Sequence, residues 1–282
     1  MSVIKFCTFA HEKLNLKASS IKAYVSDLAT VHKLRQLNED FSSNYLVKLA
    51  IRGAENLDLI KGNVGRKRCA MSFPLLKIIG NEIAGSGWSK WNKQVFWAVC
   101  TVAFFGSCRM GELLGQDKES FDPLTTLLWK DISFNSDSVT IHIKSPKSRI
   151  FSGEYVDLFL IPGKSYCPFS AMLRLSKIAS RPSMANLPVF MFDSGKLLTK
   201  AVFNTTVRAL LRGKLGSGCN LISGHSFRQA IPTVLAKFPD LVKDNHIMGW
   251  GRWSSQAFLC YTKLKLCQKR CIFGKILNVL ND

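Results

Sequence analysis

The sequence is short of the features that mark several common protein classes. It contains nine cysteines but no C-x-x-C pair and no Cys/His cluster with the spacing of zinc ligands. Its carboxylates do not cluster in a pattern that would hold magnesium, and it has no G-x-x-x-x-G-K-[ST] loop to bind a nucleotide. The sequence therefore predicts a protein that uses no metal and no cofactor.

Long hydrophobic runs are also missing. The longest nearly uncharged stretch, residues 95–108, has fourteen residues, whereas a helix that spans a membrane needs about 18 or more. We interpret this stretch as a buried helix with Cys100 and Cys108 in the core, and we expect no membrane partner. No secretory signal is visible and the number of cysteines is odd, which favours reduced thiols in an intracellular compartment.

Acidic residues are scarce compared with basic ones. Thirty-nine Lys and Arg residues oppose nineteen Asp and Glu residues, so the 282-residue chain has a net charge of +20. Both the first 68 residues and the remainder are basic. Such an excess indicates a polyanionic partner, most often nucleic acid, although a basic surface that only faces solvent is the alternative.

Apolar spacing predicts helices over residues 2–15, 19–36 and 40–56, followed by a fourth short helix. These helices would form a small bundle over residues 1–64. The next segment, KGNVGRKRC at 61–69, holds two glycines and four basic residues, which is typical of a flexible connection along DNA phosphates. A plain basic linker or a nuclear-targeting run is the alternative. The candidate DNA contacts are Lys61, Arg66, Lys67 and Arg68.

The rest of the chain predicts a mainly α domain with a small antiparallel β-sheet, which makes the fold class α+β. Alternating apolar residues predict three strands within residues 126–160. The predicted helices cover residues 73–84, 90–106, 167–180, 199–213, 225–237, 239–248, 254–264 and 267–280, the last of them amphipathic. We therefore expect a helical domain over 1–64, a basic linker over 65–71 and a second domain over 72–282.

Residues suited to phosphodiester chemistry gather in the second half of the chain. His225 and Arg228 lie three residues apart at the start of a predicted helix, and Trp253 and Tyr261 follow. Arg109 comes just after Gly106, which we expect to end a helix, and a cation there beside free backbone N–H groups would make a phosphate site. Tyrosine can act as a nucleophile, while cationic side chains can polarise a phosphate.

Four motifs together resemble the tyrosine recombinase (phage integrase-like) family. They are G-S-C-R-M-G-E-L at 106–113, S-P-K-S at 145–148, G-H-S-F-R at 224–228 and G-R-W-S-S-Q-A-F-L-C-Y at 251–261. They occur in the order of the family and with plausible spacing, and they cover about residues 70–265. The residues near Tyr261 look most like those in recombinases of eukaryotic mobile elements of the crypton or DIRS type.

The resemblance implies a role for each matching residue. Arg109 and Arg228 would grip the phosphate, and Glu112 would support Arg109. His225 would assist proton transfer from the nucleophile or position the phosphate. Trp253 would donate its indole N–H to the phosphate and keep water out of the site, and Tyr261 would attack the phosphate. A lysine on the strand-to-strand turn would protonate the departing 5′ oxygen. The wording P-K-S favours Lys147 for this role, with Lys144 as the alternative.

The resemblance also implies how such a protein would work. A helical core-binding domain and a catalytic domain would clamp double-stranded DNA, and strand exchange would pass through a 3′-phosphotyrosyl link. Dimers on each site would form a tetramer in the synapse. The helix at 267–280 is similar to a segment that family members dock onto a neighbouring protomer, although packing on its own domain is the alternative. We expect a nuclear location, or the bacterial cytoplasm if the source is prokaryotic.

Two alternative functions stay open at this point. One is a type IB topoisomerase-like enzyme that relaxes DNA with the same chemistry and without a partner. The other is a non-catalytic DNA-binding protein that has kept the fold after domestication of a mobile element. The intact set of catalytic residue types argues against the second alternative.

Overall fold

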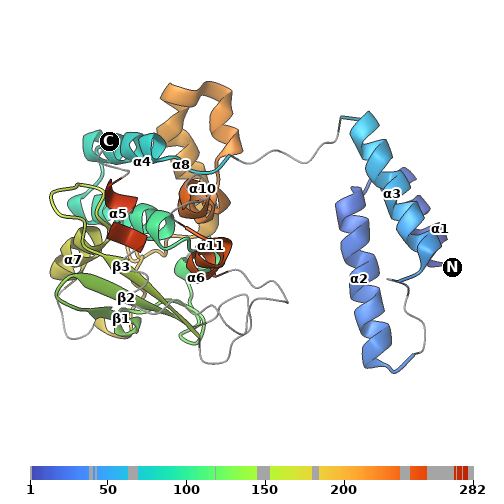
Figure 1. Cartoon of the computed structure of the whole chain (residues 1–282), viewed down its shortest axis with the longest axis horizontal. Coiled ribbons are helices and arrows are strands. Elements are labelled where there is room, and N and C mark those ends of the chain that lie inside the picture. Colours follow the sequence, from blue (N-terminus) through green and yellow to red (C-terminus); the bar gives the residue numbers. More distant parts are fainter. Residues whose placement is uncertain are drawn as a thin grey trace. The chain divides into compact units, whose positions relative to one another are not determined.

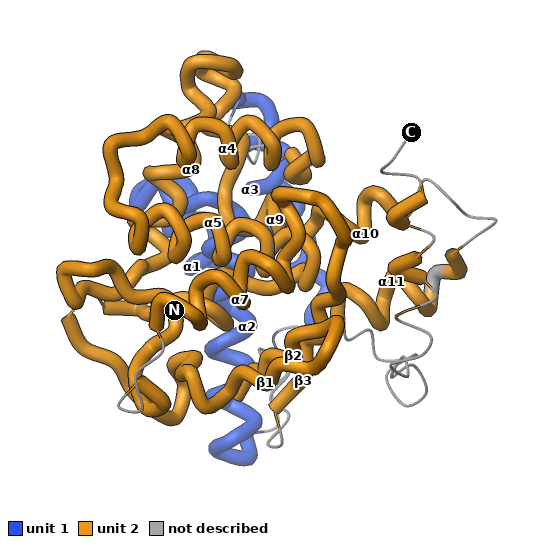
Figure 2. Tube along the Cα trace, turned by 90° about the vertical axis from the view of Figure 1, so that its left-hand side faces the viewer, with its two compact units in different colours: residues 1–67 blue, residues 68–282 orange. Residues whose placement is uncertain are grey.

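The computed structural model shows two compact units, residues Met1–Lys67 and Arg68–Asp282 (Figure 2). The division falls within the basic segment at 61–69. The structure describes residues 2–37, 41, 43–62, 69–117, 119–144, 153–179, 184–235, 242–252, 270, 272–274 and 276–278.

The first unit is a bundle of three helices, shown in blue in Figure 1. They are α1 (Val3–Glu12), α2 (Ala18–Leu34) and α3 (Tyr45–Ile60). Ser2 and Asn44 start α1 and α3, since the side chain of each accepts a hydrogen bond from a backbone N–H of the first turn. The apolar faces meet in a small core of Cys7, Ala10, Ile21, Val25, Val47 and Ile51.

The third helix differs from the prediction at both ends. It begins at Tyr45 rather than at 40, because Asn44 caps it by accepting from the N–H groups of Leu46 and Val47. It then continues to Ile60, through residues that we expected to contain the start of a fourth short helix. The predicted fourth helix is thus the end of α3.

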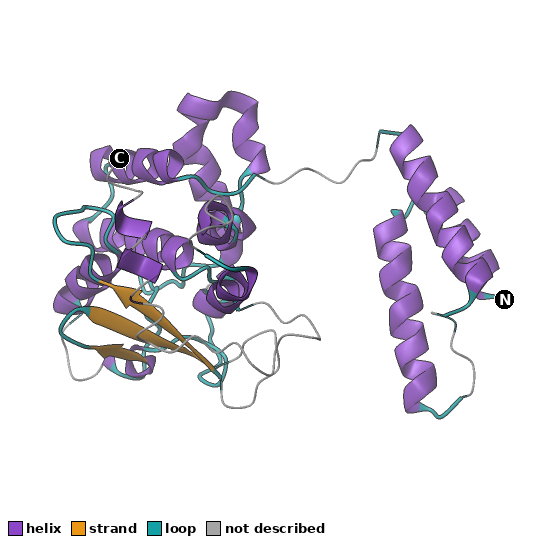
Figure 3. Ribbon diagram, viewed as in Figure 1, coloured by secondary structure: helices purple, strands orange, loops and turns teal. Residues whose placement is uncertain are grey.

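The second unit is built around one buried helix, α5 (Lys90–Phe105), in which ten side chains are buried. The apolar stretch that contains Cys100 and Cys108 is therefore core, as predicted. Figure 3 shows the helices of this unit in purple around the small sheet. They are α4 (Phe73–Gly85), α6 (Met110–Leu113), α7 (Pro168–Ile178), α8 (Lys200–Leu215), α9 (Gly224–Arg228), α10 (Ala230–Leu235) and α11 (Asp244–Gly251), with 3-10 turns at Trp129–Asp131 and Gly216–Leu221.

The sheet has three antiparallel strands in the order β1 (Ile132–Phe134), β2 (Ser138–Ile143) and β3 (Glu154–Phe159). Alternate β2 side chains are fully buried, and Ile141 pairs with Val156 of β3. The first strand is shorter than predicted. Residues 129–131 form a 3-10 turn instead, because Leu128 N–H donates to the Asp131 carboxylate and Trp129 N–H donates to Leu187 O.

Two of the predicted helices also need correction. The helix expected over 225–237 is two short helices, α9 and α10, with a break after Arg228. Pro232, in the first turn of α10, lacks the N–H that would bond to Arg228 O, which favours a break in the helix before it. The helix expected over 239–248 runs from Asp244 to Gly251, because Lys243 is its N-cap and the His246 ring accepts from Lys243 N–H.

The fold class is as predicted: the described residues are mainly helical and include one small antiparallel sheet. The described residues of the predicted 267–280 helix are helical and pack on their own unit. Ile272, Phe273 and Ile276 are buried there, and the Phe273 ring stacks on Trp250 at 6.4 Å. None of the described helices combines the length and apolar character needed to cross a membrane.

Candidate active site

Arg109 and Glu112 form the first part of the site at the start of α6. Arg109 is the N-cap, and its N–H donates to Glu112 Oε2 at 2.8 Å. Its Nη1 pairs with Glu112 Oε1 at 2.7 Å. The Arg109 side chain is 27% exposed, whereas that of Glu112 is 3% exposed. The buried carboxylate therefore holds a guanidinium that is still partly open to solvent.

The chain segment of α9 lies directly against the start of α6. A Cβ atom on Gly224 would stand 2.0 Å from the Met110 side chain, so only glycine fits there. Gly224 N–H donates to Asn204 Oδ1 of α8 at 2.7 Å. This close approach places the exposed His225, at the first turn of α9, beside the segment that carries Arg109.

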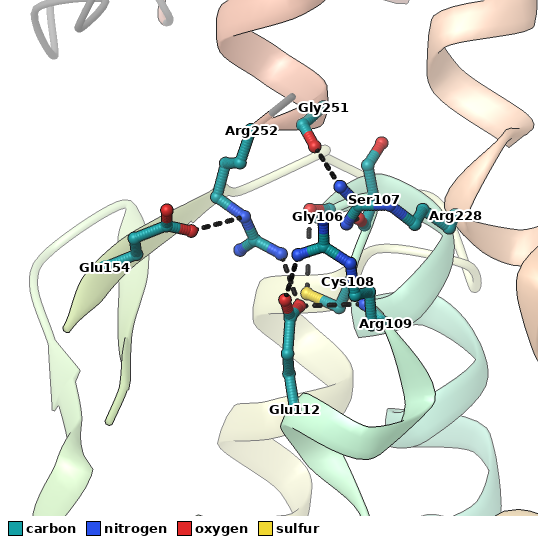
Figure 4. Close-up of polar contacts among 9 residues, drawn as sticks. All are labelled: Gly106, Ser107, Cys108, Arg109, Glu112, Glu154, Arg228, Gly251 and Arg252. Atoms are coloured by element: carbon teal, nitrogen blue, oxygen red, sulfur yellow. Dashed lines mark hydrogen bonds and ion pairs between the residues drawn. The ribbon is translucent and has the colours of Figure 1, made fainter. Parts of the chain in front are cut away.

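Arg228 is buried and joins three separate parts of the chain. Its Nη1 donates to Ser107 O at 2.9 Å and its Nη2 donates to Gly251 O at 2.7 Å (Figure 4). Ser107 has a left-handed backbone, with φ 48°, which turns its carbonyl toward the guanidinium. Burial and then the positive charge of Arg109 lower the pKa of Arg228 to about 10.

A third arginine, which we did not predict for the site, completes the cluster. Arg252 Nη2 contacts Glu112 Oε2 at 2.6 Å, and its Nε forms an ion pair with Glu154 Oε2 at 3.3 Å. Figure 4 shows it between these two carboxylates. Arg252 stands inside the quoted G-R-W motif, but nothing in the sequence indicates that Glu154, on β3, would be its partner.

Cys108 is a buried core residue close to Arg252 and Arg228. Burial raises the pKa of its thiol from 9.0 to about 11, in spite of the nearby Arg252 charge. Burial alone lowers the pKa of Arg252, but Cys108, Glu112 and Glu154 raise it above its ordinary value. Arg228 and Arg252 thus stay charged near neutral pH, as arginine does in proteins generally.

Lys144, the alternative lysine, is occupied at the base of the β2–β3 hairpin. Its Nζ pairs with Asp131 Oδ2 at 2.7 Å and donates to Pro123 O at 2.8 Å, and its side chain is 16% exposed. These bonds tie the end of β2 to the turn before β1. These two contacts give Lys144 a structural role.

Several predicted residues lie outside the part of the chain that the structure describes. They are Lys147, Trp253, Tyr261, Arg66, Lys67 and Arg68. Lys61 is described and exposed just after α3. Trp250, at the end of α11, is 9% exposed and donates through Nε1 to Phe105 O.

The described cluster is equipped to bind an anion. Arg109, Arg228 and Arg252 supply three positive charges, while Glu112 and Glu154 supply two negative charges. Guanidinium groups bind phosphate oxygens through paired N–H donors. Among the described residues, no group of three or more His, Cys, Asp or Glu side chains could hold a metal ion.

Comparison with solved structures identifies the fold. The XerH site-specific recombinase in a post-cleavage complex with palindromic difH substrate matches with a TM-score of 0.56 and 16% identity, over 97% of this chain and 73% of that one. The Tn1549 transposon integrase bound to circular intermediate DNA matches with a TM-score of 0.54 and 14% identity, over 96% and 83%. This chain has the tyrosine recombinase fold.

A third match within this fold is a lambda integrase dimer bound to a COC′ core site. Its TM-score is 0.52 at 11% identity, and the match covers 93% of this chain and 78% of that one. No protein-family model matches the sequence, and no curated protein matches it. The sequence identity to these three structures is low, at 16%, 14% and 11%. The similarity therefore establishes the fold, while the activity depends on the chemistry of the site.

Proposed function

We propose that this protein is a site-specific DNA recombinase that cuts and rejoins double-stranded DNA. One observation supports it above all: Arg109 and Arg228, 119 positions apart in the sequence, meet within one cluster through Glu112 and Ser107. The net charge of +20 suits a DNA partner. The similar structures are complexes too: XerH is bound to difH substrate, Tn1549 integrase to circular intermediate DNA, and lambda integrase to a COC′ core site.

In the proposed reaction, the Tyr261 phenol oxygen attacks the phosphorus of a scissile phosphate. A new O–P bond forms, the bond from phosphorus to the 5′ oxygen breaks, and a 3′-phosphotyrosyl link remains. The phenol proton passes to a base, for which His225 is the candidate, and the 5′ oxygen takes a proton from Lys147. Rejoining reverses these steps with another 5′ hydroxyl, so the link conserves the energy of the broken bond.

The cationic cluster would stabilise the transition state. Negative charge grows on the non-bridging oxygens when phosphorus becomes pentacoordinate, and preorganised donors are worth more in a buried site than in water. Arg109 has the exposed face that can reach these oxygens. Arg228 supplies a second positive charge from below, and the Trp253 ring would exclude water.

The resemblance to tyrosine recombinases leads us to propose the rest of the assembly. Residues 1–64 would act as a core-binding domain, residues 65–71 as a basic linker with Lys61, Arg66, Lys67 and Arg68 near phosphates, and residues 72–282 as the catalytic domain. Two protomers would bind each site and four would form the synapse. A role in excision and integration of a mobile element of the crypton or DIRS type, in the nucleus, is part of the same proposal.

Nicked suicide duplexes test this function. Duplexes that tile the DNA flanking the coding sequence are incubated with the full chain, and covalent complexes are detected by denaturing gel electrophoresis. We expect a complex with the wild type on a specific duplex and none with Tyr261→Phe. Equal complex with Tyr261→Phe, or none with any duplex, would contradict the proposal.

The same preparation separates the two alternatives. A topoisomerase-like enzyme would relax supercoiled plasmid as a monomer and without preference for one duplex. A non-catalytic DNA-binding protein would shift the duplexes in a native gel and cleave none of them.

A further inference from the structure

Arg252 holds a backbone conformation that its residue type disfavours. It is the C-cap of α11, with φ 50° and ψ 46° in the left-handed region. Glycine and asparagine are usual at such a cap, because a Cβ atom crowds the backbone there. A long side chain stays in this conformation only when the surrounding contacts hold it.

The contacts that hold Arg252 are those of the proposed active site. Its side chain is 10% exposed between Glu112, at 2.6 Å, and Glu154, at 3.3 Å. Glu112 is the same carboxylate that binds Arg109 at 2.7 Å. Arg109 and Arg252 thus share one buried carboxylate, and the position of Glu112 depends on both of them.

The residue before Arg252 contacts the other arginine. Gly251 O accepts from Arg228 Nη2 at 2.7 Å. The end of α11 is therefore connected to Arg228 through its backbone and to Arg109 through the Arg252 side chain and Glu112. Two adjacent residues fix both arginines that we propose to grip the phosphate.

Charge gives Arg252 a second effect. With it, three guanidiniums face two carboxylates, and the cluster has a net positive charge. Without it, the two remaining arginines would be neutralised by Glu112 and Glu154. A neutral cluster would no longer attract the single negative charge of a phosphodiester.

We propose that Arg252 is a positioning residue for the phosphate-gripping arginines. It orients Glu112, and through Glu112 it orients Arg109, while it offsets the negative charge of both carboxylates. This inference rests on the proposed function for its catalytic consequence. The contacts on which it depends are those of the described cluster.

Single-turnover cleavage of a suicide duplex tests the inference. Arg252→Ala is expected to slow cleavage about 100-fold, the order of losing one preorganised donor, with less than about a threefold change in the Kd for DNA. Arg252→Lys keeps the charge and is expected to recover part of the rate. The matched control is Lys196→Ala, which removes a cation from an exposed ion pair with Glu119 and should leave the rate unchanged.

A double-mutant cycle distinguishes positioning from general support of the fold. If Arg252 acts through Glu112, then Arg252→Ala slows cleavage much less in the Glu112→Gln background than in the wild type, and only the charge effect of Arg252 on Glu154 remains there. Multiplicative losses in the double variant, or a wild-type rate in Arg252→Ala, would overturn the inference. Arg252→Lys serves the same cycle if the alanine variant does not fold.

Sulfate binding tests the same inference without catalysis. Inorganic sulfate should raise the Tm of the wild type by binding to the folded protein. The part of this rise that is lost in Arg109→Ala measures sulfate binding to the arginine cluster. Arg252→Ala is expected to abolish that part as well, and an unchanged rise would overturn the inference. If the wild type forms no covalent complex, the proposed function fails while this measurement still decides the role of Arg252.

Discussion

At the scale of single residues, the lack of a side chain at Gly224 allows the start of α9 to lie against the start of α6. A methyl group at this position would collide with Met110, next to Arg109, at 2.0 Å. Interiors of proteins are packed densely enough that such a collision forces Met110 or its neighbours to shift. The spacing between His225 and Arg109 therefore depends on the absence of one side chain.

We predict that Gly224→Ala lowers the free energy of unfolding by about 1–3 kcal/mol, because an overpacked core shifts its neighbours. It should also reduce DNA cleavage. Gly213→Ala is the matched control, since this residue of α8 has nothing within 4 Å of its Cβ position, and alanine in a helix is favoured by up to about 1 kcal/mol. Urea denaturation measures both, and equal stability of the two variants would contradict the packing argument.

Cys108 gives a prediction about pH at the same scale. Because burial raises the pKa of its thiol from 9.0 to about 11, the folded state holds this proton more tightly than the unfolded state. The contribution to stability is complete below about pH 9 and is lost as the pH rises toward 11.

We expect the wild type to lose about 1–2 kcal/mol more stability than Cys108→Ala between pH 8 and pH 10.5. The alanine variant has a constant cavity cost, so the difference between the two proteins should shrink as the pH rises. Urea denaturation at the two pH values measures this difference. A difference independent of pH would show that the thiol is not held protonated by burial.

At the scale of elements, the contacts at the base of the β2–β3 hairpin assign a structural role to Lys144. Lys144 is bound to Asp131 and Pro123 at the base of the hairpin. That geometry supports Lys147 as the proposed donor of a proton to the 5′ oxygen. General acid catalysis contributes about 100-fold to 10,000-fold to a rate.

We predict that Lys147→Ala slows cleavage by at least about 100-fold, whereas Lys144→Ala slows it less than tenfold, on the order of a structural defect. A duplex with sulfur in place of the 5′ bridging oxygen should restore Lys147→Ala, because a thiolate leaves without protonation. Rescue of Lys144→Ala and not of Lys147→Ala would assign the proton transfer to Lys144.

How far the sequence predicts these elements depends on whether the signal is local. Apolar spacing and caps such as Ser72 and Ser89 predict most helices, since both act within a few residues. The shortened β1 depends instead on Leu187, which is distant in sequence. The break between α9 and α10 comes just before Pro232 in the chain, a local signal that we did not use.

The site divides in the same way. Arg109, Glu112, His225 and Arg228 stand in motifs whose order the chain preserves, so the sequence could indicate them. Arg252 escaped prediction because its carboxylates, Glu112 and Glu154, are supplied by other elements. Ser107 could not be predicted either, because its left-handed φ of 48° occurs at a residue that is not glycine.

At the scale of the whole molecule, the excess of positive charge determines how binding depends on salt. A protein that neutralises phosphates releases counterions, so its affinity falls with ionic strength. Both units are basic in sequence, and we propose that both contact DNA.

We predict that the affinity for duplex DNA falls by about 1,000-fold to 100,000-fold between 50 and 200 mM salt, as expected for 6–10 phosphate contacts. Arg109→Ala should reduce the slope of log K against log salt by about one contact. Fluorescence anisotropy over this salt range measures the slope. An affinity that does not depend on salt would contradict a phosphate-dominated interface.

Tyr261 is the residue that we propose to form the covalent link to DNA. Mass spectrometry of the covalent complex, after digestion by nuclease and protease, identifies the residue that carries the nucleotide. We predict a nucleotide attached through a 3′-phosphate to the peptide that contains Tyr261, and no such adduct for Tyr261→Phe. An adduct on any other residue, or a 5′-phosphate link, would contradict it.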